Sequence, residues 1–97
     1  MGPNQPFSIP SELWNKFREQ HQNASRELRN NVNEALDNPN VLAQGILNAQ
    51  ERDPSPLIKR AIRWNPGQLE RIGEHAESIG ISANAYIRLV VEASVRT

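Results

Sequence analysis

The sequence contains no cysteine among its 97 residues. This absence excludes disulfides, zinc-thiolate sites and thiol nucleophiles together. Long apolar runs are also missing, because none approaches the roughly 18 to 20 residues that a membrane-spanning helix requires. The first residues lack the basic-then-apolar pattern of a secretory signal. We therefore expect a soluble, cytoplasmic protein that does not enter a membrane.

Catalytic constellations are missing as well. The sequence has no glycine-rich phosphate loop, no nucleophile elbow and no paired-carboxylate arrangement. His21 and His75 fall in different predicted helices, without a neighbouring cysteine or a convincing carboxylate partner. A chain of 97 residues allows one compact domain with a modest core and little room for a large cleft. We predict that the protein is not an enzyme and uses no catalytic residues, metal, cofactor or small-molecule substrate.

Charge is balanced over the whole chain but concentrated locally. The 11 basic and 11 acidic residues cancel, yet the segment 57–64 holds three positive charges and no negative one. Side chains of a strand face alternate sides. One side of this segment consists of Ile58, Ile62 and Trp64. Its other side consists of Lys59, Ala61 and Arg63. The pattern predicts a strand that packs on helices through its apolar side and presents a cationic side to an anionic partner.

Two helices are predicted after this strand, separated by Gly80. The first begins at Asn65-Pro66, since proline suits an early helical position, and the second begins with Ser82 as its N-cap. Apolar residues recur at helical spacing in both helices. They are Leu69, Ile72, Ala76 and Ile79 in the first helix, and Tyr86, Ile87, Val90, Val91 and Val95 in the second.

The segment 4–38 has the same order of elements in a degenerate form. An extended piece is followed by a helix from an N-cap at Ser11 to about Gln22, which Asn23 closes in the left-handed conformation. Ser25 is expected to cap a second helix. The predicted core positions of this half are Phe7, Ile9, Leu13, Trp14, Phe17, Leu28, Val32, Ala35 and Leu36.

Residues 39–56 form a linker between the two halves. A short helix is possible there, weakened by Gly45. One side of that helix would consist of Val41, Leu42, Ile46 and Leu47. The chain is thus divided into a degenerate repeat over 4–38, the linker over 39–56 and a second repeat over 57–97.

Residues 57–97 resemble the ribbon-helix-helix DNA-binding family of the Arc/Mnt-like type. The resemblance rests on Arg63-Trp64 at the strand end, the spacing to Gly80, and Ser82-Ala83-Asn84 before Ile87. It implies a mainly α fold with a short antiparallel β-ribbon that enters the major groove of double-stranded DNA. By position, the base-reading residues would be Lys59, Ala61 and Arg63. The phosphate-binding backbone amides would belong to Ser82, Ala83 and Asn84. Ala61 could touch only a thymine methyl, because it has no hydrogen-bonding group.

The N-terminal half matches this family less well, since its outward strand positions, Asn4, Pro6 and Ser8, carry no charge. If it is a true repeat, the layout is similar to that of the TraY-like relaxosome proteins of conjugative plasmids, in which one chain supplies both halves of the ribbon. The alternative is a C-terminal module that self-associates between chains, with residues 1–50 as an accessory helical region. We lean towards the tandem repeat.

Two classes of function follow from the resemblance. One is sequence-specific DNA binding, as a transcriptional repressor or a conjugation accessory factor. The other is an antitoxin-like protein-interaction module with autoregulatory DNA binding. A third interpretation treats Lys59, Arg60 and Arg63 as a solvated strand edge that prevents aggregation. Arg60 lies on the apolar side of the strand, so we expect it to snorkel or to pair with a carboxylate.

Overall fold

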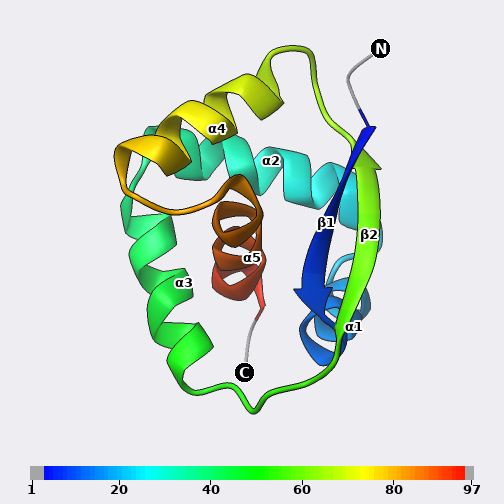
Figure 1. Ribbon diagram of the computed structural model, residues 1–97. Helices are drawn as coiled ribbons and strands as arrows, with labels where there is room; N and C mark the ends of the chain where they lie inside the picture. The colour runs from blue at the N-terminus through cyan, green and yellow to red at the C-terminus, as the bar shows by residue number, and fades with distance from the viewer. Residues whose placement is uncertain (1–3, 96–97) are drawn as a thin grey trace.

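The computed structural model describes residues 4–95, with side chains from Pro6 onward (Figure 1). Two strands and five helices make up this part of the chain. In chain order they are β1 (Asn4–Pro10), α1 (Ser11–Gln20), α2 (Ala24–Asp37), α3 (Asn40–Gln50), β2 (Leu57–Arg63), α4 (Gln68–Ser78) and α5 (Ala83–Ser94). The predicted mainly α fold with a short antiparallel β-ribbon is confirmed. Residues 96–97, the end of the predicted second repeat, lie outside the described residues, as does the side chain of Asn4.

The two strands of the chain pair with each other. The antiparallel register places Pro6 opposite Ala61 at the centre, Asn4 opposite Arg63, and Ser8 opposite Lys59. Figure 1 shows the ribbon along one side of the molecule and α3 along the other, with α5 between them. Residues 47 to 59 positions apart in the sequence therefore form one continuous two-stranded surface.

One face of the ribbon is buried against the helices. Phe7 and Ile9 of β1 and Ile62 of β2 are at most 4% exposed, and so is Trp64 directly after β2. They share a single core with residues from every helix. The predicted alternation of both strands is thereby confirmed, because the apolar side chains of each point into the same core.

The starts of α1 and α2 differ from the prediction. Pro10 is the N-cap of α1, and the linker supplies the acceptors for its first amides: the Pro56 carbonyl accepts from Ser11 N at 2.8 Å and Ser55 Oγ accepts from Glu12 N at 3.3 Å. In α2 the cap is Asn23, whose side chain accepts from the third amide of the helix. Ser11 and Ser25 were thus wrongly predicted as caps. Asn23, with φ of −117°, is not left-handed.

α4 begins later than predicted, at Gln68 rather than at Asn65-Pro66, because Gly67 interrupts the chain at φ +78°. The Gln68 side chain is buried and donates to the Arg29 carbonyl at 2.9 Å, which ties α4 to α2. Ile79 was predicted to be buried but is 47% exposed. Gly80 ends this helix as predicted: it has φ +78°, and Ile81 N donates back to the Ala76 carbonyl at 3.0 Å.

The linker does contain a helix, α3, and half of its predicted apolar side is confirmed, since Val41 packs against the core and Leu42 is buried in it. Leu42 and Gly45 face the core, whereas Ile46 and Leu47 are 47% and 57% exposed. Gly45 lies directly against α5, where an added Cβ would overlap the carbonyl oxygen of Leu89. The glycine that weakens α3 as an isolated helix is therefore the residue that lets the two backbones meet.

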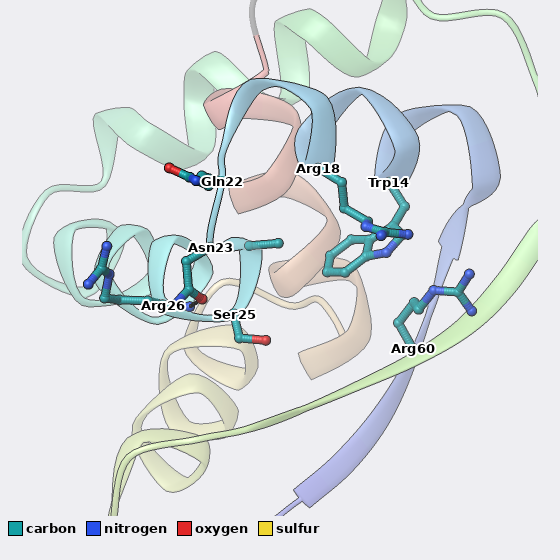
Figure 2. Close-up of a pocket in the computed structure, with 8 residues that line it drawn as sticks. Trp14, Arg18, Gln22, Asn23, Ser25, Arg26 and Arg60 are labelled. Atoms are coloured by element: carbon teal, nitrogen blue, oxygen red, sulfur yellow. Dashed lines mark hydrogen bonds between the residues drawn. The ribbon is translucent and has the colours of Figure 1, made fainter.

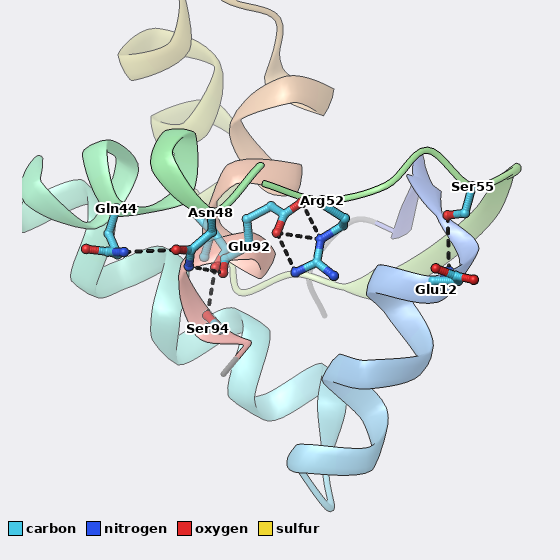
Figure 3. A network of polar contacts seen from close by, with 8 residues as sticks. Glu12, Gln44, Asn48, Arg52, Ser55, Glu92 and Ser94 are labelled. Atoms are coloured by element: carbon cyan, nitrogen blue, oxygen red, sulfur yellow. Dashed lines mark hydrogen bonds and ion pairs between the residues drawn. The ribbon is translucent and has the colours of Figure 1, made fainter. Parts of the chain in front are cut away.

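A buried ion pair fixes the end of α3 and the linker to α5 (Figure 3). Nε and Nη2 of Arg52 both lie 2.8 Å from Glu92 Oε1, and Glu92 is only 5% exposed. Asn48 of α3 donates to the Glu92 carbonyl at 2.8 Å.

In the stretch that the structure describes, no helix is both long and apolar enough to cross a membrane.

Candidate nucleic-acid interface

The outward face of the ribbon holds the three residues predicted to contact bases. Lys59, Ala61 and Arg63 are all exposed. The residues between them on the other side of β2 are the exposed Arg60 and the buried Ile62. Lys59 and Arg63 are four residues apart, which is about 13 Å along a strand. This spacing is close to four base-pair steps of about 3.4 Å. The face can thus place two cations, one on each side of a methyl group, along a short run of base edges.

The other strand contributes little charge to this face. Among its described side chains, Pro6 is exposed opposite Ala61 and Ser8 is half-buried opposite Lys59. The proline has no amide hydrogen to donate. The outward surface is therefore asymmetric, with its cationic side chains on β2.

The first turn of α5 lies against the free edge of β1. Ser82 Oγ accepts from Ala85 N at 3.0 Å, which confirms the predicted N-cap. Asn84 Oδ1 accepts from Ser8 N at 2.7 Å, and its Nδ2 donates to the Ser8 carbonyl at 2.9 Å. The amide side chain of Asn84 thus satisfies both backbone hydrogen-bonding groups of Ser8 at the strand edge. Of the predicted phosphate-binding set, the backbone amides of Ala83 and Asn84 point out of the helix, as in any first turn.

The C-terminal end of β2 is held by a side chain from α2, in the N-terminal half of the chain. Arg29 of α2 donates from Nη1 to the Arg63 carbonyl at 3.0 Å. Both strands are therefore tied to helices by side chains that sequence reasoning missed. No local pattern could have shown these contacts, since Ser8 and Asn84 are 76 positions apart. Their effect is a ribbon whose outward face is held in one orientation.

The two histidines make structural contacts. His75 Nδ1 lies 2.7 Å from the hydroxyl of Tyr86, linking α4 to α5, and burial raises the pKa of Tyr86 while the charge of Arg71 acts to lower it. His21 Nε2 lies 3.0 Å from the Ser94 carbonyl at the end of α5. No group of three potential metal ligands occurs among the described residues.

Comparison of the chain with family models, with curated proteins and with solved structures found no match. The resemblance to the ribbon-helix-helix family therefore stays a prediction that rests on the residues quoted above.

Proposed function

We propose that this protein binds double-stranded DNA in a sequence-specific manner by placing its β-ribbon in the major groove. The observation that supports this most strongly is the exposed line of Lys59, Ala61 and Arg63 above a buried apolar face. A major groove about 12 Å wide admits a two-stranded ribbon, since neighbouring strands lie about 4.8 Å apart. Such binding suits a cytoplasmic transcriptional repressor or a conjugation accessory factor.

The pairing within one chain supports a tandem repeat. Pro6 and Ala61 face each other at the centre of the ribbon, and the strand positions on either side correspond in pairs. Each strand is followed by two helices, with α3 inserted between the units. We infer that one chain supplies both halves of a pseudo-dimer. Since only β2 carries cationic outward side chains among those described, the bound sequence should be asymmetric.

The tandem arrangement predicts a monomer of 11.0 kDa in dilute solution. In this arrangement β1 of the same chain already pairs with β2, so no second chain is needed to form the ribbon. Light scattering of the full chain measures this directly. A fragment of residues 51–97 serves as the comparison; it lacks β1 and three helices of the common core and should not form a stable fold. A stable dimer of that fragment would favour the two-chain ribbon instead.

Replacing the base-reading side chains tests the DNA interface. We expect Arg63→Ala to weaken binding to a selected duplex by about 1 to 3 kcal/mol and to relax preference at one position, because a bidentate guanine contact contributes that much. Lys59→Ala should act likewise or through a phosphate. Gel-shift selection from random duplexes provides the target, and the affinity of each variant is then measured on it. Arg71→Ala, which removes an exposed charge from α4, is the matched control. Unchanged affinity and preference in Lys59→Ala/Arg63→Ala would exclude the ribbon from the interface.

A second candidate function, a protein-interaction module of the antitoxin type, is favoured by α3. This outer helix contains no charged residue, and it exposes Ile46 and Leu47 to solvent. The dependence of binding affinity on salt concentration distinguishes the two functions. DNA affinity falls steeply as salt neutralises phosphate contacts, whereas an apolar protein interface depends little on salt.

A further inference from the structure

A hollow of about 600 Å³ lies between the first turn of α2, the second half of α1 and the outer edge of β2 (Figure 2). Three arginines from these three elements line it, and no acidic residue does. The side chains that matter to the argument are Trp14, Arg18, Asn23, Ser25, Arg26 and Arg60. The hollow is thus lined by positive charge only, although the net charge of the chain is zero.

The three arginines lack carboxylate partners among the described residues. Arg60 donates to the neighbouring Lys59 carbonyl at 2.9 Å, and none of the three takes part in an ion pair there. The expected pairing of Arg60 with a carboxylate is therefore not found. Like charges that share a hollow repel one another unless an anion lies between them. The three exposed guanidinium groups therefore raise the local positive potential, which favours a negatively charged ligand.

The geometry suits an anion that arrives from solvent. In Figure 2, Arg18 lies beside Trp14, and Arg60 extends from β2 on the same side of the hollow. Arg26 extends from the other side of the first turn of α2, with its guanidinium directed away from Arg18 and Arg60. All three arginines are exposed, so their guanidinium groups can adjust to a ligand. The Asn23 side chain accepts from Arg26 N at 3.1 Å, which fixes the backbone of that turn.

The hollow lies beside the middle of β2, next to the outward face of the ribbon. Arg60 precedes the central Ala61 of β2, and Lys59 on its other side belongs to the outward face. A duplex that holds this face in its major groove must run one phosphate strand past the β2 edge. At the β1 edge the corresponding first turn of α5 offers Ser82, Ala83 and Asn84, none of them charged.

We infer that the arginine-lined hollow binds a backbone phosphate of the DNA at the β2 edge of the ribbon. This inference rests on the proposed function and assigns different roles in DNA binding to the two halves of the chain. The N-terminal half, whose strand supplies no described outward charge, contributes affinity through Arg18 and Arg26. The C-terminal half contributes sequence preference through Lys59 and Arg63. Anchoring on one side only would give the chain a single orientation on its site.

The double substitution Arg18→Ala/Arg26→Ala tests this directly. We expect affinity to fall about tenfold, which is about 1.4 kcal/mol, because exposed arginines that contact a phosphate lose charge-assisted hydrogen bonds. The loss should be equal for the selected duplex and for a scrambled duplex of the same length, because phosphate contacts carry no sequence information. The slope of log affinity against log salt should decrease by about 1 to 2. Arg18→Lys/Arg26→Lys keeps both charges and should retain the slope.

The control is again Arg71→Ala, which removes one exposed arginine charge outside the hollow. Arg71 contacts Asp37 at the far end of α2, about 20 Å along the helix from Asn23. We expect its affinity to stay within about twofold of the unaltered protein, as an exposed charge outside the interface contributes little. Thermal melting of every variant checks that the fold is kept.

Neutral methylphosphonate substitution, one phosphate at a time, locates the contact. The unaltered protein should lose affinity at a phosphate on one flank of the site, and Arg18→Ala/Arg26→Ala should be insensitive at that same phosphate. A double variant with unaltered affinity and salt slope, or one that changes only sequence preference, overturns this inference and leaves the ribbon interface intact. An unaltered protein that binds no duplex from the random pool overturns the proposed function and the phosphate site together.

Discussion

Arg52→Ala is expected to lower the free energy of unfolding by about 3 to 5 kcal/mol, the loss typical of breaking a buried ion pair from one side. The Arg52 and Glu92 side chains are only 10% and 6% exposed, and the guanidinium contacts both carboxylate oxygens. Removing the arginine leaves the Glu92 carboxylate buried without its main partner. Urea denaturation followed by circular dichroism measures the effect.

Two comparisons separate burial from charge in this experiment. Arg71→Ala breaks the Arg71–Asp37 pair, whose side chains are 57% and 81% exposed, and should cost less than about 1 kcal/mol. Arg52→Leu/Glu92→Leu removes both charges and should recover much of the loss, since apolar replacement of a whole buried pair is often neutral. Equal losses in the free energy of unfolding for Arg52→Ala and Arg71→Ala would show that the buried pair stabilises the fold no more than the exposed pair does.

Gly45→Ala is expected to cost about 3 kcal/mol, at the upper end for overpacking. The added methyl group would overlap the Leu89 carbonyl, and neither can rotate away, because the methyl group is fixed to the α3 backbone and the carbonyl belongs to the α5 backbone. α3 must shift away from α5, which also loosens the contact between Asn48 and the Glu92 carbonyl. The measurement is the denaturation midpoint together with the slope, which distinguishes lost stability from a changed unfolding transition.

Gly73→Ala is the control for this substitution. Gly73 lies inside α4, and an added Cβ would meet nothing within 4 Å. Alanine has a higher helix propensity than glycine by about 1 kcal/mol, so this variant should be as stable as the original or more stable. A Gly45→Ala variant that also gains stability would contradict the close approach of α3 and α5.

Several elements could be predicted from local sequence alone. The alternation around Ala61 and the apolar spacing from Tyr86 to Val91 depend only on the period of a strand or a helix. The stop at Gly80 and the cap at Ser82 depend on neighbours within a few residues. Each of these was confirmed, because the groups that decide them lie on the same short piece of chain.

Helix starts were less predictable, because several polar residues in each turn can serve as the cap. Ser25 and Asn23 are two positions apart, and only the path of the chain determines which side chain accepts from the helix. At α1 the acceptors come from Ser55 and Pro56, more than 40 residues away. Local propensity carries no information about such partners.

By itself, the sequence determined which segments form strands and helices, and which side of β2 is cationic, since these follow from residue spacing. Tertiary structure decided which face of α3 is buried, because Gly45 meets α5 more closely than any larger residue could. It also decided that Asn84 binds the backbone of Ser8 at the edge of β1 and that Arg18 and Arg60 line one hollow. The residues in each of these arrangements are 42 to 76 positions apart, and only the folded path of the chain brings them together.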